Sequence, residues 1–166
     1  FGRAEHIEPL RGLLRTERIV VLHSPSGAGK TSLIQAGLVP RMRKDGFKAV
    51  CPIHVGHSLP AQAFAATESV NRYSFSVIYS IEKALARTSG ASAAADVDPR
   101  TLSIPLCTYF EHRTAMRPDG EKLLLIFDQF EKLFSSALHD QPNRLQFFSE
   151  LGAVLQDRSI WAIFAI

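Results

Sequence analysis

The segment Ser24–Thr31, with the sequence SPSGAGKT, constrains the fold of this chain more than any other. It follows the apolar run RIVVLH at 18–23 and precedes a stretch in which apolar residues recur at helical spacing. A strand, a tight loop with two glycines and a helix, in this order, direct backbone N–H groups and a helix N-terminus toward one point. The pattern therefore predicts an anion-binding loop in an α/β fold.

The residue types in this loop resemble the Walker A pattern of nucleotide-binding proteins. We expect Lys30 to reach the β- and γ-phosphates and the Thr31 hydroxyl to ligate Mg²⁺, while Gly27 and Gly29 allow unusual φ values. Ser24 stands where the pattern has its first glycine, and a positive φ there would cost about 1 kcal/mol. The alternative is an ordinary turn before a helix. The predicted nucleotide-binding residues are Ser24, Pro25, Ser26, Gly27, Ala28, Gly29, Lys30, Thr31 and Ser32.

Strands and helices alternate along the rest of the chain. Apolar, β-branched segments predict strands, and apolar residues at helical spacing predict the helices between them, so we expect an α/β parallel sheet with helices on both faces. The first and third strands read as buried on both faces, Pro52 favours an edge position for the second, and Pro40 should end or kink the first helix. The expected strands are 18–23, 47–55, 123–128 and 159–166, and the expected helices begin at 30 and cover about 75–85, 105–113 and 145–155.

An acidic residue, Asp128, ends the third predicted strand after five apolar residues. Ligands of open α/β sheets bind at the carboxyl ends of the strands, where a carboxylate can hold Mg²⁺ through water. Glu131 lies three residues further on and is the candidate catalytic base that orients or deprotonates an attacking water. The alternative is structural, because Asp-x-x-Glu is also a helix-capping signature.

Composition excludes several classes of protein. The chain has 166 residues, about the length of one domain. Its longest apolar runs, at 123–127 and 161–166, are far shorter than a membrane span. The net charge of +3 comes with no dense basic cluster, so neither a membrane nor nucleic acid is an expected partner. Two cysteines far apart in sequence are typical of reduced thiols in a cytoplasmic protein.

Other constellations of reactive side chains support no chemistry. Cys51, His54 and His57 have a suggestive spacing, but residues 51 and 54 of a strand point to opposite faces, so we interpret them as structural. No His/Asp partners accompany the loop serines at a recognisable spacing. The aromatic pair Phe147 and Phe148 is expected to belong to the core.

Together these segments resemble the STAND class of P-loop ATPases (signal-transduction ATPases with numerous domains, near the AAA+ group), and within it the bacterial novel STAND NTPase domain. The sequence DQFEKLF at 128–134 is more specific than the Walker A pattern, and so is GLVP at 37–40. The similarity covers the whole chain and is weaker over 56–120. The stretches that carry it are FGRAE at 1–5, VVLHSPSGAGKTSLIQAGLVPRMR at 20–43 and LLLIFDQFEKLF at 123–134.

The resemblance implies a strand order and further parts. It places Phe1, Gly2 and Arg3 against adenine and ribose, although a frayed terminus is an equal alternative. The fourth strand would lie between the first and the third, giving the order 1-4-3-2. A sensor arginine, a fifth strand and lid or repeat domains would follow residue 166, so residues 1–166 would be an incomplete nucleotide-binding core. Without the fifth strand, 18–23 would be an exposed apolar edge through which copies associate.

The resemblance also implies a function. We expect a domain that binds ATP or ADP with Mg²⁺, hydrolyses ATP slowly, relays the state of the γ-phosphate to further domains and forms ATP-dependent homo-oligomers. A P-loop kinase or GTPase is a second hypothesis, but the guanine-specific Asn-Lys-x-Asp pattern is absent and 56–120 offers no obvious basic lid. A nucleotide-binding interaction module without turnover is the third.

Overall fold

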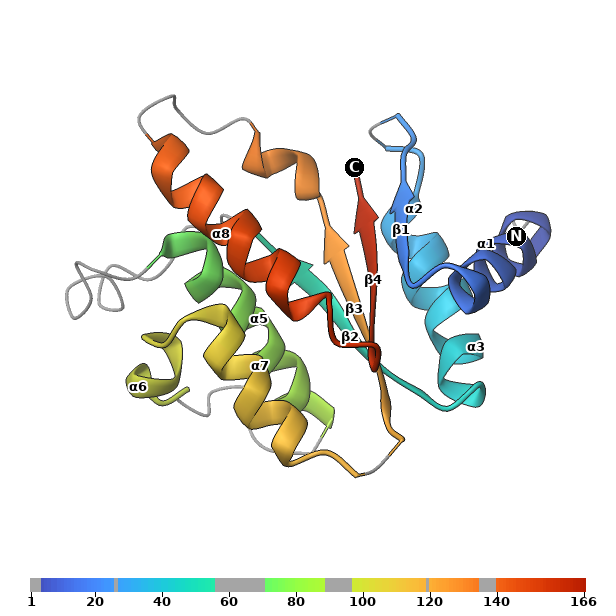
Figure 1. The fold of residues 1–166 in the computed structure, drawn as a ribbon. Helices are drawn as coiled ribbons and strands as arrows, with labels where there is room; N and C mark the ends of the chain where they lie inside the picture. Colours follow the sequence, from blue (N-terminus) through green and yellow to red (C-terminus); the bar gives the residue numbers. More distant parts are fainter. Residues whose placement is uncertain (1–3, 26, 56–70, 89–96, 119, 135–139) are drawn as a thin grey trace.

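A parallel sheet forms the centre of the molecule. The computed structural model describes residues 4–25, 27–55, 71–88, 97–118, 120–134 and 140–166. Within these residues four strands pair in the order β1-β4-β3-β2, every pair parallel, which confirms the expected order and α/β class (Figure 1). The strands are β1 (Ile19–Leu22), β2 (Phe47–His54), β3 (Lys122–Asp128) and β4 (Ile160–Ala165).

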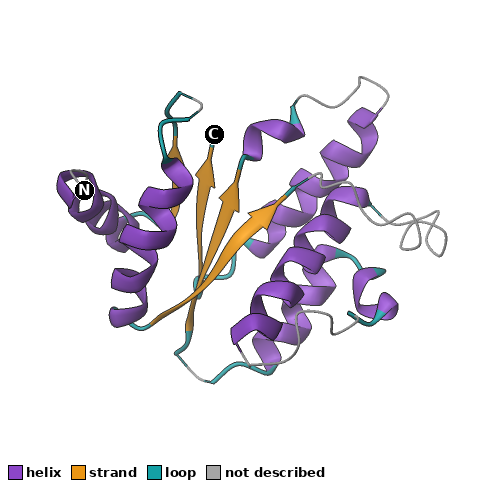
Figure 2. Cartoon of the chain, turned by 180° about the vertical axis from the view of Figure 1, so that it is seen from behind, coloured by secondary structure: helices purple, strands orange, loops and turns teal. Residues whose placement is uncertain are grey.

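Helices cover the sheet on both sides (Figures 1 and 2). On one side lie α1 (Ala4–Thr16), α2 (Lys30–Ser32), a π-helical segment η1 (Leu33–Leu38) and α3 (Val39–Lys44). On the other side lie α5 (Arg72–Thr88), α6 (Pro99–Leu102), α7 (Leu106–Ala115) and α8 (Gln141–Val154). A short 3₁₀ segment, η2 (Phe130–Leu133), follows β3.

Strand β3 explains why the core has two halves. Its residues are buried from Leu123 to Asp128, and successive side chains point to opposite faces. Leu123, Leu125 and Phe127 join the cluster under α5, α7 and α8, whereas Leu124 and Ile126 join the cluster under α1 and α3. A continuous apolar run is therefore what a strand covered by helices on both faces requires.

Strand β1 departs from the expectation of burial on both faces. Val20 is buried against the α1 side, but Ile19 and Val21 are 46% and 59% exposed. These side chains are exposed because β1 is the edge strand of the sheet, and the helices α5 to α8 cover the other three strands instead (Figure 1). At the opposite edge, β2 carries a register irregularity between Val50 and Ile53, next to Pro52, as predicted for an edge strand.

The helix that follows the loop does not end at Pro40. It widens through η1, where the Val39 N–H reaches the carbonyl of Ile34, and continues through α3 to Lys44. A π-helical turn changes the hydrogen-bond register immediately before a residue that has no N–H. Of the two expected effects of Pro40, termination does not occur, and the helix is instead irregular immediately before the proline.

Helix α1 was not predicted from the sequence. Its buried residues Ile7, Leu10 and Leu14 pack on the helix after the loop, where Gly37 leaves room for Ile7. The guanidinium of Arg11 holds Asp45 with two hydrogen bonds of 2.7 and 2.6 Å, and these hydrogen bonds lower the Asp45 pKa. These contacts fix α1 beside the loop.

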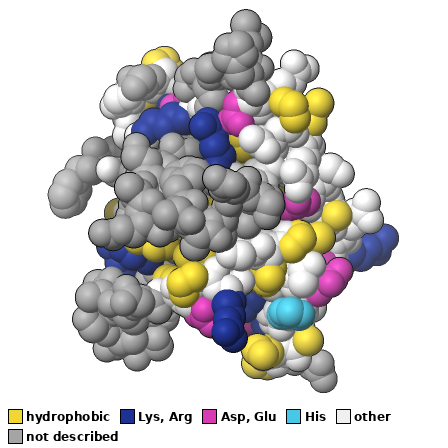
Figure 3. All heavy atoms as spheres, turned by 90° about the vertical axis from the view of Figure 1, so that its left-hand side faces the viewer, with side chains coloured by type: hydrophobic (Ala, Val, Ile, Leu, Met, Phe, Trp, Pro, Cys, Tyr) yellow, Lys and Arg dark blue, Asp and Glu magenta, His cyan; other side chains and the backbone are white. Residues whose placement is uncertain are grey.

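Helices on the other face follow the sequence more closely. Asp98 caps α6 by accepting from the Arg100 N–H, and Pro105 precedes α7. Phe147 is buried as expected, but Phe148 is 38% exposed, so only the first of these two aromatic residues belongs to the core. Leu145, on the same helix, is 62% exposed. Seen from the side of α5 to α7, the described hydrophobic side chains form small groups separated by charged and other ones (Figure 3).

None of the helices in the described ranges is long and apolar enough to cross a membrane.

Candidate nucleotide-binding site

The described part of the loop after β1 has two glycines in the left-handed region and a closed turn. Gly27 and Gly29 have φ values of 77° and 76°, which glycine adopts without strain. The Ala28 N–H donates to the Pro25 carbonyl at 3.1 Å and closes the turn. Ser24 is not among the described residues with a positive φ, so the strain expected at this position does not occur.

Lys30 begins the helix and its side chain folds back over the loop. Its Nζ donates to the Ser24 carbonyl at 2.5 Å and to the Pro25 carbonyl at 3.3 Å. The ammonium group is therefore held above the turn by neutral oxygens. A polyphosphate in the loop would meet this charge together with the N-terminus of the helix.

Thr31 and Asp128 meet across the sheet. The Thr31 Oγ1 lies 2.8 Å from Oδ2 and 3.1 Å from Oδ1 of Asp128. Strand β4 lies between β1 and β3, and the Ser24 N–H donates to the Ile166 carbonyl at 3.3 Å, so the strand order brings the loop and the end of β3 to one edge. The two residues proposed from sequence for one metal site are thus neighbours.

The carboxylate of Asp128 does not cap the next helix. Gln129, not Asp128, is the N-cap residue of η2, and no side chain makes a capping hydrogen bond there. Asp128 is only 6% exposed, and its described hydrogen bonds go to Thr31. The capping alternative therefore does not describe Asp128, whose carboxylate is engaged by the Thr31 hydroxyl.

Glu131, the candidate base, lies in η2 with an exposed side chain. Within the described residues its carboxylate makes no hydrogen bond or ion pair, and only its backbone carbonyl is engaged, by the Phe134 N–H. Burial of Phe130 and Leu133 anchors η2 to the core beside Glu131. The acid is therefore at the same end of the sheet as Asp128, and none of the described residues competes for its carboxylate.

A cavity of about 720 Å³ opens between α1 and the loop. Loop residues Ser24, Ala28 and Lys30 form one end of it. The rest of its wall is mostly apolar and comes from α1, from the end of β1 with the residue after it, and from the start of η1: His6, Pro9, Leu10, Leu13, Leu22, His23 and Leu33. Helix α1 was not predicted from the sequence, and so this wall of the cavity was not predicted either. A continuous void beside the lysine is large enough for a nucleoside.

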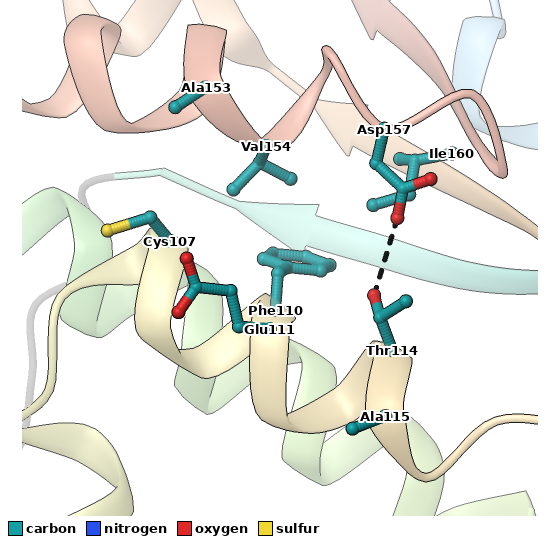
Figure 4. Close-up of a pocket in the computed structure, with 9 residues that line it drawn as sticks. All are labelled: Cys107, Phe110, Glu111, Thr114, Ala115, Ala153, Val154, Asp157 and Ile160. Carbon is teal, nitrogen blue, oxygen red and sulfur yellow. Dashed lines mark hydrogen bonds between the residues drawn. The ribbon is translucent and has the colours of Figure 1, made fainter.

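A second cavity, of about 440 Å³, lies between α7 and the end of α8 (Figure 4). Its polar lining includes Glu111 and Asp157, and Asp157 accepts from Thr114 at 3.3 Å. Ile160 begins β4, so this cavity is near the amino ends of the strands, away from the loop. Acidic lining makes it unsuited to phosphate.

Some predicted positions lie outside the described residues. These are Phe1, Gly2, Arg3 and Ser26, together with His57 of the suggested Cys/His group. Among the described residues, no three His, Cys, Asp or Glu side chains form a group that could hold a metal ion. Ser32 is described, and it is the last residue of α2 with an exposed side chain.

Comparison with known protein families identifies one match. A family model described as Novel STAND NTPase 1 matches residues 1–166. No curated protein and no solved structure gives a significant match.

Proposed function

The chain belongs to the Novel STAND NTPase 1 family, and from this premise we propose that it binds Mg-ATP as the switch domain of a regulatory ATPase. The observation that carries the proposal is the contact of Thr31 with Asp128 beneath a glycine-containing loop. Family membership supports an NTP-binding role. The sequence at 24–31 and 128–131 supports the finer assignment to ATP and slow hydrolysis.

The residues at this edge suit a magnesium ion. A threonine hydroxyl and a carboxylate are hard oxygen donors, and Mg²⁺ in NTPases is held by such a pair together with phosphate oxygens and waters. The buried Asp128 carboxylate has no described cationic partner, so its charge is left for a cation. Thr31 and Asp128 would hold the ion, which supplies charge neutralisation between the β- and γ-phosphates.

Lys30 and the loop would orient the triphosphate. The loop N–H groups would bind the phosphate oxygens, and Lys30 would exchange its carbonyl partners for the β- and γ-phosphates. Glu131 would accept the proton of the attacking water, as an exposed carboxylate without competing partners. Hydrolysis would be slow, and the γ-phosphate state would be relayed to further domains.

The cavity beside α1 would receive the base and ribose. Apolar residues Pro9, Leu13 and Leu33 offer surfaces against which a purine ring can pack. No Asp or Glu is among the described residues that line the cavity, whereas guanine presents N–H donors that call for such an acceptor. This favours adenine. The opening residues Phe1, Gly2 and Arg3 remain a proposed part of the same wall.

A module that binds nucleotide without turnover is the second candidate. The observation that favours it is the exposure of Glu131, which no described contact holds in a fixed position. Measurement of bound nucleotide against released phosphate separates the two candidates. Transfer of labelled phosphate to an acceptor instead of water would indicate a P-loop kinase.

Self-association is a further part of the proposal. The exposed side chains of Ile19 and Val21 on β1 provide an apolar edge, and copies of the chain would assemble through it in an ATP-dependent manner. Light scattering at high protein concentration checks this, and a monomer with and without Mg-ATP would contradict it.

The direct experiment compares two lysine variants. Lys30→Ala should abolish Mg-dependent ATP binding, because it removes the ammonium charge that is held above the loop. Lys44→Ala is the matched control, since Lys44 is an exposed lysine at the end of the same helical segment. The proposal would be contradicted if the Lys30→Ala variant bound ATP as tightly as the wild type, or if both variants lost the same amount of ATP affinity.

A further inference from the structure

Gln129 is the only non-glycine residue with a positive φ within the described ranges, at 55°. A left-handed conformation is unfavourable for an L-residue, because it brings the Cβ too close to the following carbonyl oxygen. Glycine would avoid that cost. Strain of this kind persists where the surroundings over-determine the backbone, and such positions concentrate at functional sites.

The neighbours of Gln129 hold it in this conformation. Asp128 on one side is buried and bound to Thr31. Phe130 on the other side is buried, and its ring centroid lies 4.7 Å from that of Phe164 and 5.6 Å from that of Phe127. The backbone between a fixed carboxylate and a fixed aromatic ring has little freedom.

The left-handed turn also decides where the Gln129 side chain lies. Along an extended β3, residue 129 would share the face of Phe127 and enter the apolar core. The turn gives that place to Phe130, which belongs to the core cluster, and leaves Gln129 exposed at the carboxyl edge. Gln129 directly follows Asp128, so its exposed side chain starts from the same edge of the sheet as the Asp128–Thr31 contact.

Within the described ranges the side-chain amide of Gln129 makes no hydrogen bond. It makes no capping hydrogen bond to η2, and no described side chain or backbone group bonds to it. An amide offers one acceptor and two donors, so it can hold a water and direct its lone pair. It has no useful basicity, so it positions a nucleophile without taking its proton.

We propose that Gln129 positions the water that attacks the γ-phosphate, with Glu131 accepting the proton. This rests on the proposed function. The water oxygen forms a bond to the γ-phosphorus, and the bond to the β–γ bridging oxygen breaks with its electron pair remaining on ADP. The water proton passes to the Glu131 carboxylate and from there to solvent.

Three substitutions separate positioning from backbone strain. Gln129→Gly removes both the amide and the strain, Gln129→Ala removes the amide and keeps the strain, and Gln129→Asn keeps an amide on a residue that tolerates the left-handed region. The rate of phosphate release should depend on whether the side chain at 129 carries an amide. The thermal midpoint of unfolding should depend on whether the residue at 129 tolerates the left-handed conformation.

The measurements are single-turnover phosphate release with protein in excess, ATP affinity, and the thermal midpoint. We expect the Gly and Ala variants to lose phosphate release equally, by about 100-fold, with ATP affinity within about twofold of wild type, and the Asn variant to be intermediate. The Gly variant should unfold at a higher temperature than the Ala variant.

Each other outcome overturns the inference. A Gly variant that releases phosphate as wild type does, with a slow Ala variant, would show that only the turn matters. Wild-type protein that binds Mg-ATP but releases no phosphate would remove the positioning role and leave the proposed binding intact. Wild-type protein that binds no ATP would overturn both proposals.

Discussion

The Thr31 hydroxyl lies 2.8 and 3.1 Å from the two carboxylate oxygens of Asp128, although 97 residues separate them in the chain. The parallel order β1-β4-β3 produces this contact, since it brings the loop after β1 and the end of β3 to one edge of the sheet. The pair is therefore at once a structural tie and the best candidate for a metal-binding centre.

The tie between Thr31 and Asp128 is expected to stabilise the fold. A double-mutant cycle with Thr31→Val and Asp128→Asn should give a coupling energy of about 1–2 kcal/mol in urea unfolding without nucleotide, because the hydrogen bond is charged and its acceptor is buried. A matched cycle of Thr31→Val with Asp98→Asn, an exposed acid far away in α6's cap, should give none. Additive losses in the first cycle would mean that the contact contributes nothing.

The cavity beside α1 predicts where nucleotide affinity can be lost without loss of stability. Leu13 lines the cavity and is 46% exposed, so Leu13→Glu should leave the thermal midpoint nearly unchanged. It should weaken ATP binding by about tenfold, because it removes part of the apolar wall proposed for the base and adds a negative charge to a cavity that receives an anionic nucleotide.

Leu145→Glu is the control for that variant, since Leu145 is 62% exposed on α8, on the other side of the sheet. Isothermal titration of ATP into both variants checks the expectation. If both variants bind ATP with equal affinity, the base does not bind in the cavity beside α1.

Contact between Gly37 and Ile7 predicts a coupled pair. A Cβ at Gly37 would overlap the Cδ1 of Ile7, so Gly37→Ala should lower the free energy of unfolding by about 1 kcal/mol despite the better helix propensity of alanine. In an Ile7→Val background the overlapping methyl group is gone, and the same change should be neutral or stabilising. Urea unfolding of the four proteins measures this, and a loss of the same size in both backgrounds would contradict it.

The ion pair of Asp45 with Arg11 of α1 should make a pH-dependent contribution to the stability of the fold. Hydrogen bonds from Arg11 lower the Asp45 pKa in the folded state, so its contribution to stability is fully present above the unfolded value of about 3.9 and is lost as the pH falls through the folded value. The midpoint difference between wild type and Asp45→Asn should therefore be constant at neutral pH and shrink below about pH 4. A difference that persists unchanged into strong acid would assign the effect to packing instead.

Local patterns were enough to predict the strand, loop and helix order around 24–31, the position of Asp128 at the end of β3 and the alternation of strands and helices. The strand order came from the family resemblance. Helix α1 was not predicted, and with it the wall of the proposed base cavity was missed, because Pro9 lies inside the helix and interrupts the expected pattern.

Other features depend on tertiary context. Exposure of Val21 depends on which strand stands at the edge, and the passage of the helix through Pro40 depends on a π-helical turn that packing selects. The left-handed backbone of Gln129 has no sequence signal, since glutamine is not a residue that favours it.

The Mg²⁺ dependence of ATP affinity tests the central claim most directly. Calorimetric titration of ATP into wild-type protein should give saturable binding at one site that is tighter with Mg²⁺ than with EDTA, and Thr31→Val should abolish the difference. Wild-type protein that binds no ATP at millimolar concentration, or binds it equally well with and without Mg²⁺, would contradict the account.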